Sequence, residues 1–233
     1  MCATSLAAGS TYWRCTEFKV DSGRLFYSRF MVSPLEVGQA NTLGVALRRT
    51  LLGELEGACF IFAVFPAEIT HEYTAVAGVR ESVHDILMNL KEIVLRGHSS
   101  VVREAYISIA GPGEVTARDV VLPPFVRAVD PTQYIATVTG KMNLNIELKI
   151  GKGRGYRGRN MVESQKGEFP LDAIFTPIRN VNYSIHCYEN HSRGIMKEML
   201  LLEIWTNGSI TPREAVSEAS RSLINLFSSF AYA

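Results

Sequence analysis

Two segments near opposite ends of the chain carry apolar residues at the spacing of an amphipathic helix. In the first, from Asn41 to Leu55, leucine recurs at every fourth position, which places one stripe through Leu43, Leu47, Leu51 and Leu55. The second begins with Thr211, Pro212 and Glu214, a capping-box pattern with proline at the first helical position. Its stripe consists of Val216, Ala219, Leu223, Leu226, Phe227 and Phe230. Both stripes need to be covered and neither contains a catalytic side chain, so they indicate assembly rather than chemistry.

The composition is that of a folded globular protein. The 233 residues are 47% hydrophobic and 20% charged, and the chain is long enough to bury a sizeable core. Because the 24 Lys and Arg residues nearly balance the 23 Asp and Glu residues, the net charge is only +1. Any contact with nucleic acid is therefore expected to be local or to pass through partners. No apolar run approaches the roughly 20 residues that span a bilayer, so no membrane partner is expected.

Outside the glycine-rich segment Gly153–Gly158, no group of residues has the spacing of a catalytic, metal or cofactor site. The cysteines form no Cys-x-x-Cys pair, and His186 beside Cys187 lacks the second spaced pair of a zinc site. A Ser-His-Asp triad, a Walker loop or a pair of catalytic carboxylates cannot be assembled either. We therefore expect no catalytic residue, no metal and no cofactor in this chain. Reduced, unpaired thiols are expected at all four cysteines, Cys2, Cys15, Cys59 and Cys187.

The hydrophobic periodicity predicts an α+β protein. The first residues, Met1 to Thr16, contain no acid and are rich in Ala, Ser and Thr, as in an organelle-targeting remnant or a frayed terminus. Beyond them, strands are predicted at 24–35, 59–65, near 71–73, 142–150, 181–188 and 199–205. A third helix is predicted at 82–96 with Gly97 as its left-handed cap, and a charged loop at 151–167.

The order of these elements predicts a discontinuous first domain. The two end segments are expected to pair with each other, which makes the middle of the chain an insertion. The predicted dimerisation subdomain, strands plus the two amphipathic helices, covers residues 1–57 and 179–233. The inserted subdomain, mixed and mainly antiparallel β, covers residues 58–178.

A glycine-rich segment offers an alternative function. Gly153-Arg-Gly-Tyr-Arg-Gly158 matches the dinucleotide pattern G-x-G-x-x-G, and a phosphate- or nucleotide-using enzyme could be built on it. That pattern requires an apolar helix after the glycines, and the sequence that follows does not have that character. A cluster of basic residues around the same loop indicates contact with phosphates, contact with an acidic protein surface, or simply a solvated loop: Lys149, Lys152, Arg154, Arg157 and Arg159.

Arg48 and Arg49 leave the first helical stripe in two directions, because adjacent helical residues are about 100° apart. They form either a solvent-facing pair or an interface contact, in which the planar guanidinium makes bidentate bonds.

Several long motifs resemble one family, the alpha subunit of bacterial-type, multi-subunit DNA-dependent RNA polymerase, in its N-terminal region. The resemblance covers nearly the whole chain from about Arg24 and is closest to the plastid branch. It rests on Asn41-Thr-Leu-Gly-Val-Ala-Leu-Arg-Arg49, His71-Glu-Tyr73, Gly78-Val-Arg-Glu-Ser-Val-His-Asp-Ile-Leu-Met-Asn-Leu-Lys91, Gly153-Arg-Gly-Tyr156 and Glu203-Ile-Trp-Thr-Asn-Gly-Ser209.

The resemblance implies a non-catalytic homodimer that nucleates assembly of the beta and beta-prime type large subunits, which hold the catalytic magnesium. It implies a dimer interface at Leu43, Leu47, Leu51, Val216, Leu223, Phe227 and Phe230. It also implies contacts to the large subunits at Arg48, Arg49, Lys91, Arg154 and Tyr156.

The resemblance also implies the localisation of this protein and its relation to promoter DNA. Chloroplast localisation is expected, with the bacterial cytoplasm as the alternative. The family's promoter-binding C-terminal domain would follow Ala233 and is not present in this chain, so promoter DNA is expected to be contacted only indirectly. The archaeal or eukaryotic counterpart, a heterodimer, is disfavoured because both helices and the bacterial-type middle segment lie in one chain.

Overall fold

The computed structural model describes residues 11–66, 68–69, 71–97, 102–159, 167–190 and 194–231. Its contacts divide the chain into two compact units. We call Met1–Leu55 together with Ile178–Ala233 the end unit, and Glu56–Pro177 the inserted unit. The predicted α+β class, with a discontinuous first part and an inserted, mainly antiparallel β part, is confirmed.

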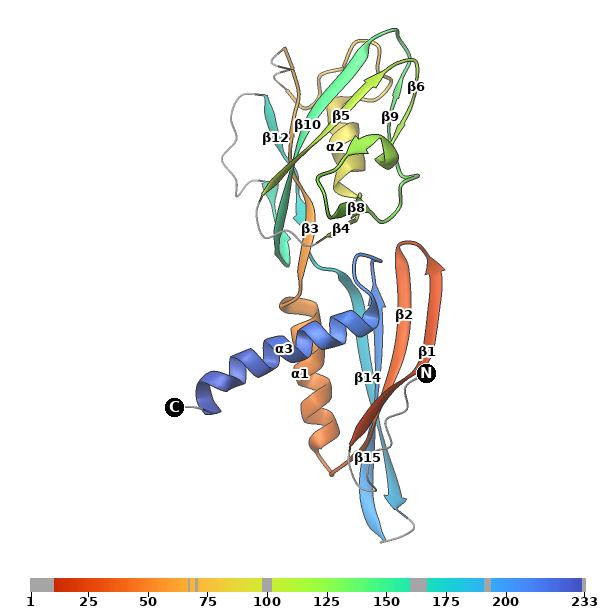
Figure 1. The fold of residues 1–233 in the computed structure, drawn as a ribbon, viewed down its shortest axis with the longest axis vertical. Helices are drawn as coiled ribbons and strands as arrows, with labels where there is room; N and C mark the ends of the chain where they lie inside the picture. The colour runs from red at the N-terminus through yellow and green to blue at the C-terminus, as the bar shows by residue number, and fades with distance from the viewer. Residues whose placement is uncertain are drawn as a thin grey trace. The chain divides into compact units, whose positions relative to one another are not determined.

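The end unit is built on a four-stranded antiparallel sheet in the order β1-β2-β15-β14 (Figure 1). Its strands are β1 (Tyr12–Ser22), β2 (Leu25–Leu35), β14 (Ile178–Asn190) and β15 (Ile195–Thr206). Pairing of β2 with β15 joins the two ends of the chain, with Trp205 opposite Tyr27 and Glu203 opposite Arg29. The expectation of a frayed terminus was wrong for residues 12–16, because they pair with β2 as an edge strand. Residues 1–10 lie outside the described part.

Helices α1 (Gln39–Gly53) and α3 (Pro212–Ala231) share one core with this sheet. Leu47, Leu51 and Leu55 from the α1 segment and Ala215, Val216 and Ala219 from α3 pack with strand residues Phe30, Val181, Leu202 and Ile204. Full burial of a Leu, Val, Ile or Phe side chain stabilises a fold by about 1.5–3 kcal/mol, so Leu47, Leu51 and Leu55 of the α1 stripe are accounted for within one chain.

The two helices begin in different ways. Thr211 and Glu214 form the predicted capping box at α3: the Thr211 N–H donates to Glu214 Oε2 (2.9 Å) and the Glu214 N–H donates to Thr211 Oγ1 (3.3 Å). At α1, Gly38 is in the left-handed region (φ 91°) and provides no side-chain cap. Instead, the buried carboxylate of Glu198 on β15 accepts a hydrogen bond from the Ala40 N–H (3.1 Å). A negative charge at this position also complements the helix dipole.

Gly44 lets α1 approach β14 closely, and this gives a testable prediction. A Cβ at Gly44 would lie 2.6 Å from Cδ2 of the Tyr183 ring, whereas a Cβ at Gly53, at the end of the same helix, would meet nothing within 4 Å. We expect Gly44→Ala to lower the free energy of unfolding by about 1–3 kcal/mol through overpacking. The matched control Gly53→Ala should be neutral or slightly stabilising. Urea unfolding of both variants measures the difference, and equal stabilities would contradict the packing.

The inserted unit contains a seven-stranded sheet in the order β7-β5-β10-β3-β4-β8, with β12 also paired to β3. The strands are β3 (Glu56–Val64), β4 (Leu95–Gly97), β5 (Arg103–Ala110), β7 (Val120–Val121), β8 (Val126–Ala128), β10 (Asn143–Arg154) and β12 (Glu168–Pro170). Two small sheets pair β6 (Gly113–Thr116) with β9 (Tyr134–Val138), and β11 (Tyr156–Arg157) with β13 (Ala173–Ile174). A short 3-10 turn, η1, spans Ala117–Asp119.

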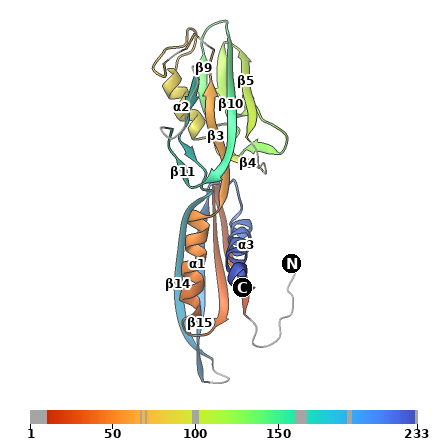
Figure 2. The same cartoon turned by 90° about the vertical axis from the view of Figure 1, so that its left-hand side faces the viewer.

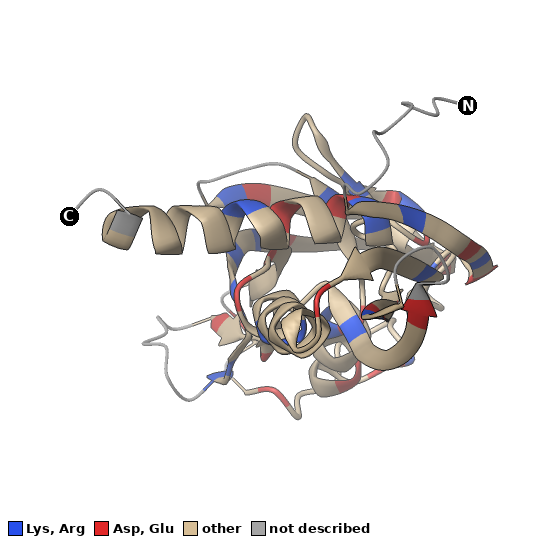
Figure 3. Ribbon diagram, turned by 90° about the horizontal axis from the view of Figure 1, so that it is seen from below, with Lys and Arg blue, Asp and Glu red and all other residues tan. Residues whose placement is uncertain are grey.

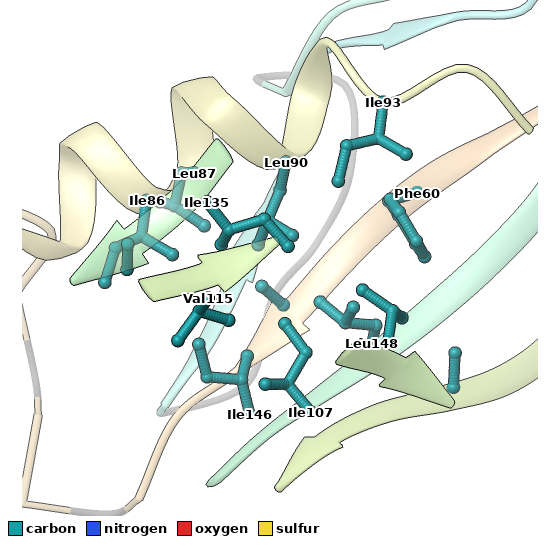
Figure 4. Packing of buried hydrophobic residues seen from close by; sticks show 14 of the residues in the cluster. Phe60, Ile86, Leu87, Leu90, Ile93, Ile107, Val115, Ile135, Ile146 and Leu148 are labelled. Carbon is teal, nitrogen blue, oxygen red and sulfur yellow. The ribbon is translucent and has the colours of Figure 1, made fainter. Parts of the chain in front are cut away.

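Helix α2 (Val83–Lys91) packs against β9 and β3 (Figure 2). Ser82 and Asp85 form a capping box at its start. Figure 4 shows Ile86, Leu87 and Leu90 on the side of α2 that faces the strands. Their partners in this core include Phe60, Ile107, Val115, Ile135, Ile146 and Leu148. None of the described helices is long and apolar enough to cross a membrane.

Three local predictions in this unit were wrong. The helix predicted at 82–96 ends at Lys91, because Leu95 pairs with Ala58 and Ala128 as part of β4, and Gly97 pairs with Val126 rather than capping a helix. Residues 71–73 form a turn, not a strand. The loop predicted at 151–167 begins as strand, since β10 continues to pair with β3 as far as Arg154. Residues 160–166 of that prediction lie outside the described part.

Candidate interaction surfaces

The C-terminal half of α3 carries an apolar surface that no described element covers. Residues from Ser222 to Ala231 include no charged side chain, and Figure 3 shows this half of the helix without red or blue. Phe227 is 59% exposed and Phe230 is 76% exposed. We call the four exposed side chains Ile224, Leu226, Phe227 and Phe230 the α3 apolar surface. Such a contiguous apolar surface on a folded chain is typical of a protein contact.

The structure separates the residues of the sequence-predicted dimer interface into two groups. Leu47, Leu51 and Val216 are buried in the core of the end unit, and Leu223 is partly buried against that core. Leu43, Phe227 and Phe230 are exposed. The first group is therefore covered by its own chain, and only the second is accessible to a partner.

Arg48 and Arg49 lie on the exposed part of α1. Val45 and Leu52, which are also exposed, lie near them on the helix. Neither arginine forms an ion pair with any residue in the described ranges. Two guanidinium groups beside two aliphatic side chains form a mixed surface of the kind found at the centre of protein interfaces.

Lys91 and Tyr156 meet at a carboxylate that the sequence did not reveal. Lys91 Nζ lies 3.1 Å from Asp172 Oδ2, and the Tyr156 hydroxyl donates to Asp172 Oδ1 (3.0 Å), which also accepts from the Arg159 N–H (3.0 Å). These bonds hold the pKa of Asp172 below its ordinary value, with the Arg159 N–H the largest cause, and the bond to Asp172 raises the pKa of Tyr156. The Tyr156 ring itself remains exposed.

The Asp172 site predicts a pH-dependent loss of stability. Because the folded pKa of Asp172 is depressed, its stabilisation is present above the ordinary Asp pKa of 3.8 and is lost as the pH falls through the folded value. Asp172→Ala should therefore lower the free energy of unfolding by about 1–3 kcal/mol at pH 7. Tyr156→Phe, which removes one of the three bonds, should cost less. In denaturant titrations the Asp172→Ala difference should shrink below pH 3.8, and a pH-independent difference would contradict this explanation.

The remaining basic side chains of the Gly153–Gly158 region have partners within the inserted unit. Lys152 Nζ and Arg154 Nε lie 2.8 Å and 3.3 Å from Glu56 carboxylate oxygens. Lys149 pairs with Glu168 (2.5 Å) and Arg159 with Glu72 (2.7 Å), and the Arg157 guanidinium lies 5.5 Å from the centre of the Phe175 ring. These contacts account for the basic cluster as internal ion pairs and stacking, and they lower the pKa of Glu56 mainly through Lys152.

Two of the three glycines of the G-x-G-x-x-G match have structural explanations. A Cβ at Gly153 would lie 2.9 Å from the Phe175 ring, so this glycine makes room for an internal aromatic side chain. Gly155 has a φ of 64°, at the turn between β10 and β11. Strand β11 then pairs with β13, where a dinucleotide site needs a helix. This geometry gives no support to the nucleotide-enzyme alternative.

The described cysteines are free thiols. Cys15 and Cys187 are exposed, Cys59 is buried, and Cys2 lies outside the described ranges. Burial raises the pKa of Cys59 to about 12, so its thiol is protonated near neutral pH. Among residues in the described part, no three His, Cys, Asp or Glu side chains are grouped to hold a metal ion.

The fold and these surfaces describe a two-unit α+β protein with exposed surfaces of the kind that contact other proteins. The family model "RNA polymerase Rpb3/RpoA insert domain" matches residues 58–176. The chain is 63% identical over 223 residues to the DNA-directed RNA polymerase subunit alpha of Huperzia lucidula, covering 96% of this chain and 66% of that protein. For the subunits named alpha of Takakia lepidozioides and Glycine max, identity is 57% and 56%, covering 98% and 95% of this chain and 66% of each relative.

The chain therefore belongs to the alpha-subunit family of DNA-directed RNA polymerase, in its plastid branch. It spans 66% of the length of these three relatives.

Proposed function

We propose that this chain is a non-catalytic assembly subunit of plastid RNA polymerase, working as a homodimer that binds the beta and beta-prime type large subunits. Nucleotide addition and its magnesium ions belong to those large subunits, and the chain needs no cofactor of its own. Promoter DNA is contacted only indirectly. The observation that carries the proposal is the α3 apolar surface on a helix half without a single charge.

A second copy of the chain is the natural partner for this surface. A two-fold contact places the same patch of both copies together, and an uncharged apolar patch is complementary to itself. In the proposed contact, Leu43 of α1 contributes one exposed side chain, and the four side chains of the α3 apolar surface contribute the larger apolar area. Three buried side chains contribute indirectly, because they pack α1 and α3 against the sheet and hold both helices in position: Leu47, Leu51 and Val216.

Two surfaces are proposed for the large subunits. In the end unit, Arg48 and Arg49 present guanidinium groups to a carboxylate-bearing partner. In the inserted unit, Asp172 holds Lys91 and the Tyr156 hydroxyl, so the exposed tyrosine ring is oriented before a partner arrives. Preorganisation of this kind reduces the entropy lost on binding. Arg154, anchored to Glu56 at the end of β10, is a further contact.

The proposal is tested by co-expressing a tagged chain with both large subunits. We expect the large subunits to co-purify with it, RNA synthesis to be found only in the complex, and the chain alone to be inactive. The same purification with the tag on an unrelated plastid protein is the control. A chain that catalyses nucleotide transfer by itself, or that never captures a large subunit, would overturn the proposal.

The isolated chain is also expected not to bind NAD, FAD or ATP. The backbone around Gly153–Gly158 lacks the helix N-terminus that holds phosphate in a dinucleotide site, and the neighbouring cations are paired with Glu56, Glu168 and Glu72. Calorimetry with each nucleotide should give no measurable heat of binding. Micromolar affinity that Gly155→Val abolishes would revive the enzyme alternative.

A further inference from the structure

The outward face of the large sheet in the inserted unit carries an exposed tyrosine between a valine and a glutamate. Tyr106 on β5 is opposite Val121 on β7 and Glu147 on β10. Glu147 is in turn opposite Val64 on β3. Residues directly opposite each other lie on the same face of a sheet, so these four side chains form one row across four strands. Tyr106 is 51% exposed and Val121 is 47% exposed, so burial in this fold explains neither side chain.

The strands that carry this row form a rigid support. All eight residues of β5 pair with β10 without a register shift. The residues that flank Tyr106 and Glu147 along their strands are buried in the core, among them Ile107, Ile146 and Leu148 (Figure 4). The Tyr106 hydroxyl forms no hydrogen bond with a residue in the described ranges. An aromatic ring that projects from a fixed backbone loses little entropy on binding, and tyrosine is enriched among the residues that dominate interfaces.

Two carboxylates beside Tyr106 have no cation among the described residues. Glu147 is opposite the tyrosine, and Glu104 lies two residues before it on the same face of β5. Both are exposed, and neither forms an ion pair or a side-chain hydrogen bond with a residue in the described ranges. Lys149 is opposite Glu104 on this face, but its ammonium group pairs with Glu168 (2.5 Å). The surface around the tyrosine ring is therefore negatively charged.

An exposed aromatic ring flanked by two carboxylates matches the chemistry of an arginine side chain. The planar guanidinium stacks on an aromatic face and also forms bidentate bonds with a carboxylate, whereas a lysine ammonium is a point charge. Arg103 of this chain precedes Glu104, but strand alternation places it on the opposite face of β5. A nucleic acid is a poor fit, because Glu104 and Glu147 repel its phosphates. The complementary partner is therefore a basic protein segment.

We propose that Tyr106, with Glu104 and Glu147, is a docking surface for an arginine in a basic segment of another protein. The guanidinium stacks on the tyrosine ring and pairs with the two carboxylates, while Val121 and Val64 contact the apolar part of the segment. The apolar contacts and the ion pairs lie side by side in one row of the sheet. This surface is additional to those of the proposed function and rests on it only in taking the partner from the assembled polymerase.

A photoreactive benzoyl-phenylalanine in place of Tyr106, in polymerase purified through a tag on this chain, tests the proposal. We expect a crosslink that mass spectrometry maps to a net-basic, arginine-containing segment of another protein. The same group in place of Phe18, which is 57% exposed on β1, is the control for exposure, and the yield at residue 106 should be about tenfold higher. A crosslink to nucleic acid, to a net-acidic segment or to a second copy of this chain would overturn the proposal, as would a yield no higher than at residue 18.

Charge variants separate a specific contact from simple proximity. With the photoreactive group at residue 106, Glu104→Gln and Glu147→Gln together should reduce the yield about tenfold, and Glu147→Asp alone should largely keep it. The double variant should leave the melting temperature unchanged, because neither carboxylate has a partner in the described ranges. An unchanged yield, or a lowered melting temperature, would contradict the docking role.

Co-purification of the large subunits is recorded for every variant, so that the two proposals can fail separately. If the large subunits co-purify but residue 106 does not crosslink, the docking surface fails while the proposed function stands. If residue 106 crosslinks to a basic segment but no large subunit co-purifies, the proposed function fails while the docking surface stands.

Discussion

Replacing Phe227 and Phe230 together with glutamate is expected to leave the chain folded and monomeric. Both side chains are exposed in the single chain, so the substitutions remove little from its own core. In a two-fold dimer they would bury four carboxylates in an apolar contact, and each hot-spot loss is worth about 2 kcal/mol or more. The combined effect is a weakening of about a thousandfold or more in the dimer dissociation constant.

Size-exclusion chromatography with circular dichroism checks this prediction at micromolar concentration. Phe18→Glu is the matched control, because Phe18 on β1 is 57% exposed, close to the 59% of Phe227, and lies outside the α3 apolar surface. The control should remain dimeric. A double variant that is still dimeric would show that α3 is not the contact, and one that has lost its helical signal would show that these side chains belong to the fold.

Arg49→Ala is expected to weaken capture of the second-largest, beta-type subunit at least about tenfold while the dimer stays intact. Arg49 is exposed on α1 and forms no ion pair with a residue in the described ranges, so its removal should not affect stability. In an interface, its loss would leave a partner carboxylate buried and unpaired, which is the larger part of the cost.

Pull-down of the beta-type subunit by immobilised dimer measures the effect of Arg49→Ala. Arg14→Ala, an exposed arginine on β1, is the control and should capture as well as the unchanged chain. Equal capture by Arg49→Ala would place the contact elsewhere. Loss of capture together with loss of the dimer would mean that Arg49 acts through dimerisation instead.

The sequence predicted the fold well where periodicity was long and unbroken. The helices at α1 and α3 and the alternating strand that begins β10 followed from apolar spacing, and the pairing of the end segments followed from the order of the elements. Strand β1 was missed because its polar and aromatic residues form an exposed edge without clear alternation. The end of α2 was misplaced because Ile93 and Val94 continue the helical spacing beyond Lys91, where the helix ends.

The candidate surfaces were harder to predict than the elements that carry them. Periodicity identifies the apolar face of a helix but not what covers that face. Leu47 and Leu51 pack on the sheet of their own chain, whereas Phe227 and Phe230 are exposed. The apolar spacing in the sequence does not distinguish the two pairs. Asp172, which joins Lys91 to Tyr156, lies 81 residues from Lys91 in the chain and has no local signal.

Light scattering on the purified, unmodified chain tests the central claim most directly. The claim is that a second copy covers the α3 apolar surface without help from any other protein. The account predicts a mass of twice the 25.8 kDa chain, unchanged by dilution through the micromolar range. A mass of 25.8 kDa at those concentrations would contradict it.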